Sequence, residues 1–188
     1  GVFYGAEFAG VDPDNGDALW YVNEKNTNGD IVNPGSTTND FSTANFVVLG
    51  HPTPDYIASI TNTIGYKGFE LAFMFQGVSG NKIHLTGDAY MSANAPWFDN
   101  QTADQLNCWK KPGDIVDVPQ PRIGYSNGDQ ARSSRFLSDG SYLKLRSLTL
   151  SYDLPQKFIS KAKFDKIRLY VQTENLLTFT KYRGWDPE

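Results

Sequence analysis

The chain has 188 residues, with 17 basic and 21 acidic side chains, so its formal net charge is −4. This mild acidity argues against a nucleic-acid-binding protein, which usually carries a basic stripe. One cysteine and two histidines exclude a disulfide framework and disfavour a structural zinc site. The sequence also contains no long apolar run of the kind that predicts a transmembrane helix.

The chain is predicted to be all-β, because short β-rich runs are separated by Gly, Asn, Asp and Thr. A first hairpin is expected over residues 3–22, with its turn at Asp12–Gly16. Residues 12–17 do not fit a calcium-binding loop, because glycine stands fifth and no Glu stands twelfth. The almost wholly polar segment 23–40 is predicted to be a long loop.

The clearest hairpin spans residues 55–78, with Lys67-Gly68 as its turn. In each strand, every second residue forms a mostly apolar set. In the first strand this set begins and ends in tyrosine and consists of Tyr56, Ala58, Ile60, Asn62, Ile64 and Tyr66. In the second strand it consists of Phe69, Leu71, Phe73 and Phe75. A membrane strand needs about 9–11 residues and favours Tyr at both interfaces, as Tyr56 and Tyr66 would provide. The opposite parity suits a polar lumen, with Ser59, Thr61, Thr63, Glu70 and Gln76. Ordinary soluble strands remain the alternative.

Residues 81–135 show little strand pattern, so we expect a functional loop, a disordered segment or a loop on a large scaffold. A short helix is expected over 102–109. Flat aromatic rings beside carboxylates and amides suit sugar stacking and hydroxyl binding, and this predicts a substrate-binding set. Its members are Trp97, Phe98, Asp99 and Trp109. The alternative is that these side chains pack the loop itself or a partner protein.

The strand "SYLKLRSLTLSY", 141–152, leaves two interpretations open. Lys144 and Arg146 share a parity with Leu148, and a cation on the lipid face costs about 2–4 kcal/mol at mid-bilayer. Either the embedded part begins near Leu148, with both cations outside the bilayer, or a bulge switches parity before Leu148 and Leu143 and Leu145 face lipid. A basic helix over 155–164 and a last strand near 166–179 follow.

The stretch "FLSDGSYLKLRSLTLSYDLPQKFISKAKFDKIRLYVQTENLLTFTKYRGWDPE" resembles the C-terminal signature of the SusC/RagA family, TonB-linked outer-membrane transporters of Bacteroidetes. "GFELAFMFQGVSGNKI" and "EFAGVDPDNGDALWY" resemble upstream strands of the same family. The resemblance touches both ends and the middle of the chain.

The resemblance implies an antiparallel segment of a large outer-membrane β-barrel, of the roughly 22-stranded type, with long extracellular loops and one short periplasmic helix. Residues 1–188 would form part of the C-terminal third of the barrel, without the plug domain and the final strand. Open sheet edges are not tolerated in lipid, so another chain or a missing segment would supply the remaining strands. The alternative is that the segment exists as an isolated, soluble or partly refolded piece.

The implied function is TonB-dependent import of oligosaccharide or peptide with a SusD-like lipoprotein, and no cofactor or metal is expected. TonB would act through the missing plug, outer-membrane lipid would surround the barrel, and loops 23–54 and 81–135 would contact substrate or lipoprotein. An enzyme is not expected, because the lone His51 and His84 have no catalytic partner. The alternative is a soluble β-sandwich carbohydrate-binding module that uses Trp97 and Trp109 as a platform.

Overall fold

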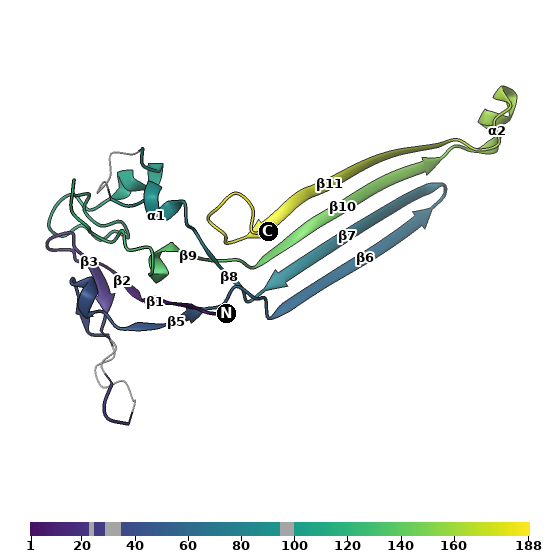
Figure 1. Ribbon diagram of the computed structural model, residues 1–188. Coiled ribbons are helices and arrows are strands. Elements are labelled where there is room, and N and C mark those ends of the chain that lie inside the picture. Colours follow the sequence, from purple (N-terminus) through teal and green to yellow (C-terminus); the bar gives the residue numbers. More distant parts are fainter. Residues whose placement is uncertain (23–24, 29–34, 95–99) are drawn as a thin grey trace. The chain divides into compact units, whose positions relative to one another are not determined.

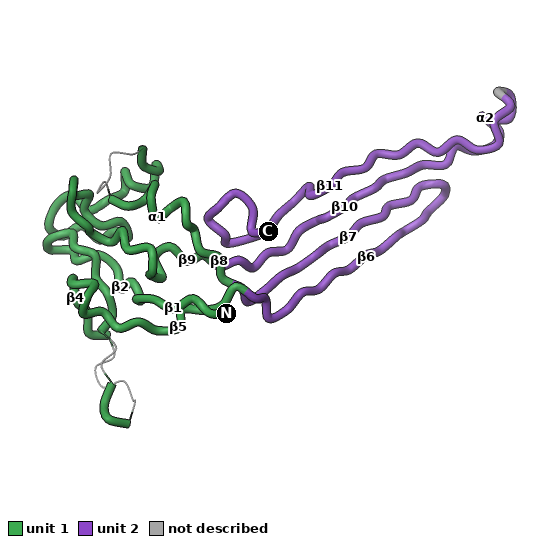
Figure 2. The backbone as a smooth tube through the Cα atoms, viewed as in Figure 1, with its two compact units in different colours: residues 1–52, 82–138 green, residues 53–81, 139–188 purple. Residues whose placement is uncertain are grey.

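The computed structural model describes residues 1–22, 25–28, 35–94 and 100–188, and the chain divides into two compact units (Figure 2). Unit 1 comprises residues 1–52 and 82–138, and unit 2 comprises residues 53–81 and 139–188. Strands and loops dominate both units, as the turn-forming residues between β-rich runs predict. Among the described residues, no helix has the length and apolar character needed to span a membrane.

Unit 2 is a four-stranded antiparallel sheet with the order β11-β10-β7-β6 (Figure 1). Its strands have 11 to 13 residues, about the length that a tilted strand needs to cross the hydrocarbon of a bilayer. They are β6 Tyr56–Tyr66, β7 Phe69–Ser79, β10 Tyr142–Asp153 and β11 Arg168–Thr180. The hairpin predicted over residues 55–78 is therefore confirmed.

The turn between β6 and β7 consists of Lys67 and Gly68 alone. Their φ angles are +47° and +88°, and a two-residue hairpin turn of type I′ requires positive φ at both central positions. Glycine adopts this backbone readily, whereas lysine is strained there. The tight turn places Tyr66 opposite Phe69 and thereby sets the register of the whole hairpin.

The connection between β10 and β11 is helical but shorter than predicted. Pro155 is the N-cap of α2, Gln156–Ile159, and a single 3-10 turn, η4 Ser160–Ala162, follows it. Lys163 then adopts the left-handed conformation, with φ of +59°, and ends the helix. The expected helix over 155–164 is thus reduced to about one α-turn and one 3-10 turn, anchored by the buried Ile159.

The described residues of unit 1 form three small sheets rather than one large one. Short strands joined by turns produce this arrangement, because Gly, Pro and Asn interrupt each apolar run after a few residues. The pairings are β1 Phe3–Ala6 with β5 Phe46–Gly50, β2 Phe8–Val11 with β3 Ala18–Tyr21 and β4 Thr37–Thr38, and β8 Lys82–His84 with β9 Leu137–Asp139. The first hairpin, predicted over residues 3–22, is confined to β2 and β3, because β1 pairs with β5 instead.

Trp20 is the centre of the core of unit 1. Its side chain is 1% exposed and packs with Ala6 and Ala18. Its ring meets Phe8 and Phe41 edge-on, with centroids 5.3 and 5.0 Å apart, an arrangement that the quadrupoles of aromatic rings favour. Phe41 begins the 3-10 helix η1, Phe41–Thr43, so this short helix closes one side of the core.

Buried amides order the long segment that carried no strand pattern. Asn127 is 6% exposed; its Oδ1 accepts from Ala18 N at 2.8 Å, and its Nδ2 donates to Gly16 O and Gln120 O at 3.0 and 2.9 Å. Asn94, 1% exposed, donates to the carbonyl of Asn127. One buried side chain therefore joins the first hairpin to residues far along the chain.

The helices of this segment are short. The helix expected over 102–109 is a 3-10 helix, and the Thr102 side chain makes no capping hydrogen bond; it contacts the Ser92 hydroxyl at 2.7 Å. The helices are α1 Asp88–Met91, η2 Ala103–Asn107 and η3 Ser134–Phe136. Single turns of this kind depend on tertiary packing, because helix nucleation is unfavourable without it.

Candidate functional site

The two faces of the sheet of unit 2 differ in chemistry. Directly paired residues on neighbouring antiparallel strands point to the same side, so the register assigns each side chain to a face. The apolar face carries Tyr56, Ala58, Ile60, Asn62, Ile64, Tyr66, Phe69, Leu71, Phe73, Phe75, Leu143, Leu145, Leu148, Leu150, Tyr152, Leu169, Val171, Thr173, Leu177 and Phe179. The polar face carries Ser59, Thr61, Thr63, Glu70, Gln76, Lys144, Ser147, Thr149, Ser151, Gln172, Glu174 and Thr178, with Ile57, Ala72, Met74, Val78, Tyr142 and Tyr170.

A β-bulge in β10 produces this separation. Leu145 pairs with Phe75, whereas Ser147 pairs with Met74, the neighbour of Phe75, so Arg146 is an extra residue. A bulge of this kind reverses the alternation of side chains beyond it.

The bulge decides between the two interpretations of β10. Leu143 lies on the same face as Leu148, and Lys144 lies on the opposite, polar face. The interpretation that kept Lys144 on the same face as Leu148 is therefore wrong. The alternative, a parity switch before Leu148, is confirmed, and it keeps both cations away from the apolar face.

The apolar face is exposed and bordered by tyrosines at both ends, as predicted. Tyr56 and Tyr66 are 75% and 68% exposed, and Ile60, midway between them, is 67% exposed. At the turn end the rings of Phe69 and Tyr152 lie 4.3 Å apart between centroids. A water-soluble protein rarely leaves so large a continuous apolar surface uncovered, so this face is suited to lipid.

Charged residues meet on the polar face, toward the end of the sheet that lies opposite the Lys67-Gly68 turn. Lys144 is 1% exposed, and its Nζ lies 2.6 Å from Asp186 Oδ1 and 3.1 Å from Glu188 Oε2. Glu188 also pairs with Arg146 and accepts from the hydroxyl of Tyr142 at 3.1 Å. The segment 181–188, which follows β11, therefore returns onto the polar face and covers Lys144.

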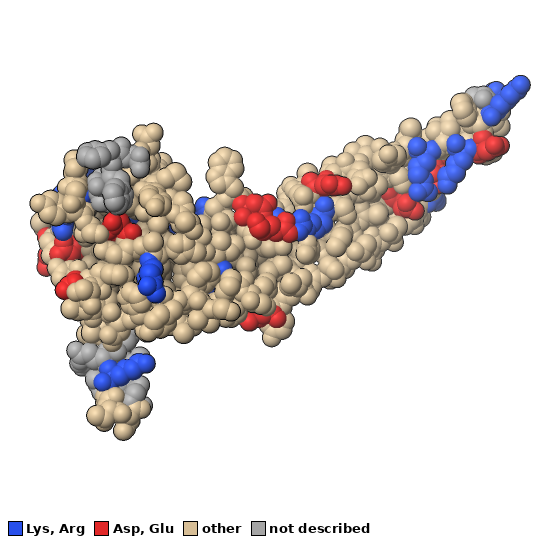
Figure 3. All heavy atoms as spheres, viewed as in Figure 1, with Lys and Arg blue, Asp and Glu red and all other residues tan. Residues whose placement is uncertain are grey.

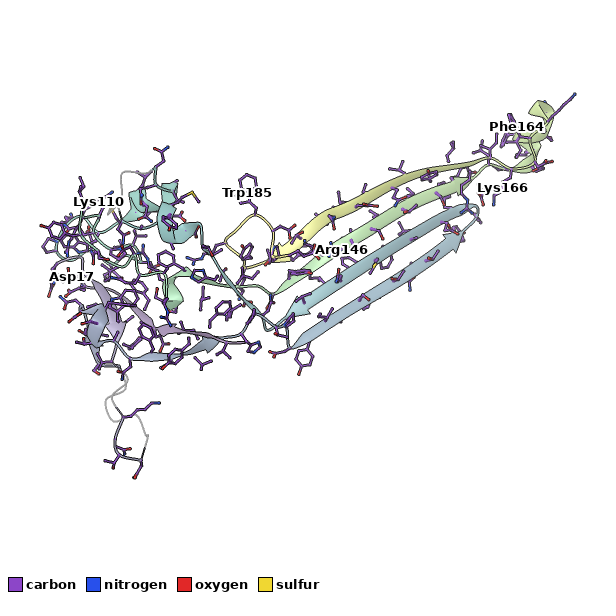
Figure 4. The ribbon with its side chains drawn as sticks, in the orientation of Figure 1. Asp17, Lys110, Arg146, Phe164, Lys166 and Trp185 are labelled. Carbon is purple, nitrogen blue, oxygen red and sulfur yellow. The ribbon has the colours of Figure 1, made fainter. Side chains whose placement is uncertain are left out.

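The bulge residue Arg146 holds the strands beside it. Its Nε donates to Gln76 Oε1 at 2.5 Å, and its Nη1 donates to Asn175 Oδ1 at 3.0 Å. Asn175 has φ of +50°, a conformation that Asn tolerates better than most residues. Arg146 thus connects β7, β10, β11 and the returning segment, while Trp185 in that segment is wholly exposed and points away from the sheet (Figure 4).

A second charged group lies at the turn end of the sheet. Arg168 binds Asp153 with two nitrogens, Nε at 2.7 Å and Nη2 at 2.9 Å, and its Nη1 lies 3.1 Å from Glu70 Oε1. Lys166 Nζ lies 3.3 Å from Asp153 Oδ2. Bidentate pairing of this kind orients the guanidinium and joins β7, β10 and β11 where the strands end.

Of the predicted substrate-binding residues, Trp97, Phe98 and Asp99 lie outside the described residues. Trp109 is 6% exposed, and its Nε1 donates to Pro13 O at 3.0 Å. A side chain at Gly16 would meet the indole at 2.6 Å, so the ring lies directly on the first turn. Trp109 packs the loop, which was the alternative for this residue; its role in substrate binding stays a prediction, and its burial does not favour it.

Sequence reasoning did not identify the group formed by Lys144, Arg146, Asp186 and Glu188. The available signal was the pair of cations inside a leucine-rich strand, because a cation there needs an acidic partner. Nothing in the local pattern indicated that the partners would be Asp186 and Glu188, some 40 residues later.

The hydroxyls, amides and paired charges of the polar face can hydrogen-bond a polar solute. Among the described residues, no group of three His, Cys, Asp or Glu side chains could hold a metal ion.

No family model matches the chain, but comparison with curated proteins shows that it is similar to TonB-dependent receptors. It is 34% identical, over its whole length, to the TonB-dependent receptor P3 of Formosa agariphila, and covers 18% of that protein. It is 22% identical to the TonB-dependent receptor SusC of Bacteroides thetaiotaomicron, over 73% of the chain and 13% of SusC. The chain thus spans less than a fifth of the length of these relatives.

Solved structures agree with the sequence comparison. The structure of the RagAB peptide transporter matches 99% of the chain with a TM-score of 0.80 and 28% identity, and the match covers 20% of that chain. The RagAB peptide importer in its 'closed-closed' state matches with a TM-score of 0.77 and 30% identity. The antiparallel strands described above therefore have the same fold as part of the RagAB peptide transporter.

Proposed function

Because this chain belongs to the SusC/RagA family of TonB-dependent receptors, we propose that it forms part of the barrel wall of an outer-membrane nutrient importer. The single observation that carries the proposal is the sheet of unit 2, whose two faces suit two different media. Its apolar face suits acyl chains, and its polar face suits a water-filled lumen.

The proposal requires further strands. In the described part of the chain, β6 and β11 are the edges of the four-stranded sheet, and their outer backbone groups have no partner strand. Unpaired backbone groups in hydrocarbon cost several kcal/mol each, so the edges must pair with the rest of a closed barrel. Residues 1–188 would be part of the C-terminal third of that barrel, and the plug domain and the final strand would come from the rest of the receptor.

We place loops 23–54 and 81–135 on the extracellular side and the Lys67-Gly68 turn and α2 on the periplasmic side. The substrate would be an oligopeptide or oligosaccharide, captured together with a SusD-like lipoprotein, and TonB would supply energy through the plug. The relation to a peptide importer supports this class of cargo. The described residues of the segment would bind and guide the solute without making or breaking a bond.

A soluble β-sandwich is the less favoured function. A sandwich buries one face of each sheet against a second sheet about 10 Å away. In unit 2 the corresponding residues Ile60, Phe69 and Val171 are 67%, 52% and 68% exposed. The exposed apolar face therefore favours the barrel wall.

Uptake by cells tests the proposal. A strain that lacks the full-length receptor containing this segment, and a strain that lacks TonB, would be supplied with labelled oligopeptides or labelled oligosaccharides. We expect both strains to lose uptake of the same class of solute, and the complemented strain to regain it. A receptor found outside the outer-membrane fraction, or unchanged uptake of both solute classes, would contradict the proposal.

A further inference from the structure

The connection between β10 and β11 carries an exposed set of basic and aromatic side chains. We call residues 155–167 the basic turn; it contains four lysines and one acidic residue, for a net charge of 4 − 1 = +3. The lysines are Lys157, Lys161, Lys163 and Lys166. Figure 3 shows basic side chains gathered at this end of unit 2.

Most of this positive charge is not neutralised within the described residues. Lys166 pairs with Asp153, whereas Lys157, Lys161 and Lys163 form no ion pair with any residue that the structure describes. All three are exposed. They differ in this from Lys144 and Arg146, whose charges are met by acidic residues on the polar face.

Two large apolar side chains accompany the lysines. Phe158 and Phe164 are 64% and 54% exposed, although Ile159 between them is buried. The Nζ of Lys157 lies 4.9 Å from the centre of the Phe158 ring. Phe164 projects from the helical part of the connection, and Lys166 lies at its base beside the strand ends (Figure 4). A basic surface with exposed aromatic rings is typical of segments that lie at a membrane–water interface.

The basic turn adjoins the end of the apolar face. Asp153 N donates to Gly68 O at 2.8 Å, so the Lys67-Gly68 turn and the end of β10 lie side by side. The apolar face ends here in Tyr66, Phe69 and Tyr152, and Lys67 Nζ lies 5.2 Å from the centre of the Tyr66 ring. Aromatic residues of this kind mark the border of the hydrocarbon. The unpaired lysines therefore lie just beyond that border, at the depth of lipid headgroups.

We propose that the basic turn binds anionic phospholipid headgroups of the periplasmic leaflet, with Lys157, Lys161 and Lys163 contacting phosphate and Phe158 and Phe164 entering the headgroup region. This inference rests on the proposed outer-membrane function. Charge complementarity and continuity with the apolar face select a lipid surface over a protein partner.

Lipid titration of the purified full-length receptor tests the proposal. The receptor is stripped of lipid in neutral detergent, and phosphatidylglycerol or phosphatidylcholine is added while native mass spectrometry counts bound lipids. Each lysine near an anionic leaflet strengthens binding about fivefold, so three lysines change affinity by about 100-fold. We expect Lys157→Gln/Lys161→Gln/Lys163→Gln to weaken phosphatidylglycerol binding by up to this factor, with phosphatidylcholine unaffected.

Matched variants separate charge from nonspecific effects. The triple Lys→Arg variant keeps the charge and should bind phosphatidylglycerol as the wild type does. Lys25→Gln/Lys110→Gln/Lys111→Gln removes three exposed lysines of unit 1 and should leave binding unchanged. Phe158→Ser/Phe164→Ser should weaken binding of both lipids, because an apolar side chain does not distinguish headgroup charge. Added salt should weaken the binding of the anionic lipid alone, because salt screens charge–charge attraction, with a Debye length of about 10 Å at 0.1 M.

Equal phosphatidylglycerol affinity in the wild type and the Lys157→Gln/Lys161→Gln/Lys163→Gln variant overturns the proposal. Crosslinking of the basic turn to a periplasmic protein without any preference for anionic lipid overturns it as well. The titration needs neither substrate nor TonB, so its failure is distinct from loss of uptake. A receptor that imports solute but shows no lysine-dependent lipid binding contradicts this inference alone.

Discussion

Lys144 Nζ lies 2.6 Å from Asp186 Oδ1, although the two residues are 42 positions apart and Lys144 is almost completely buried. The contact holds the segment after β11 against the polar face. A buried ammonium without a partner would be strongly unfavourable, so the strand and the returning segment stabilise each other.

We expect Lys144→Met to release residues 181–188 from the polar face. Asp186 is 56% exposed and can be solvated when its partner is lost, so the cost should be about 1–3 kcal/mol rather than the larger cost of a fully buried orphan charge. Limited proteolysis of the receptor should show faster cleavage at Lys181 or Arg183. Lys166→Met, which removes a pair whose lysine is 65% exposed, should cost less than about 1 kcal/mol. Equal effects of the two substitutions would contradict the interpretation.

The assignment of faces predicts opposite outcomes for two neighbouring residues of β10. Leu148→Arg places a charge on the apolar face, where it should cost about 2–4 kcal/mol at mid-bilayer. Thr149→Arg places the same charge on the polar face and should be tolerated. The measurement is the fraction of receptor in the outer membrane that migrates as a folded barrel in unheated gel samples. Normal assembly of Leu148→Arg would show that this face does not meet lipid.

The contact between Gly16 and Trp109 predicts that alanine destabilises the protein more at Gly16 than at Gly35. Gly16 has φ of +76° and Gly35 has φ of +88°, so alanine is strained by about 1–2 kcal/mol at either position. A Cβ at Gly16 would also meet Trp109 at 2.6 Å, whereas nothing lies within 4 Å of one at Gly35. Gly16→Ala should therefore cost about 1–3 kcal/mol more than Gly35→Ala.

Resistance of the loops to protease, measured on folded receptor over a denaturant series, would report this difference. Gly16→Ala should lower the stability more than Gly35→Ala does. If both variants behave alike, the packing of the indole on the first turn contributes little, and Trp109 becomes available for another role.

Asn127 provides a test of the buried amide that orders unit 1. Its Nδ2 donates to two carbonyls, Gly16 O and Gln120 O, and Asn127→Asp would turn a carboxylate oxygen toward both. Repulsion and two unpaired acceptors should destabilise unit 1 by about 2–4 kcal/mol. Asn28→Asp, at an exposed position, is the control and should change stability little. Hydrogen exchange of residues 8–21 should speed up only in Asn127→Asp.

The local sequence pattern was sufficient to predict an element whose structure depends only on its own residues. The hairpin of β6 and β7 could be predicted because alternation over 11-residue strands and the Lys67-Gly68 turn are both local, and the tyrosine borders belong to one strand. The resemblance of the C-terminal stretch to a transporter family likewise needed only the order of residues.

The sequence by itself determined the long strands of unit 2, the Lys67-Gly68 turn and the contrast between apolar and polar alternate positions. Only the tertiary structure decided which residues of β10 before the bulge at Arg146 share a face with Leu148 after it, because a bulge is defined by the register against β7. It also decided that Lys144 meets Asp186 and Glu188 and that Trp109 covers Pro13 and Gly16. These contacts join residues 42 to 96 positions apart, and no local periodicity encodes such pairings.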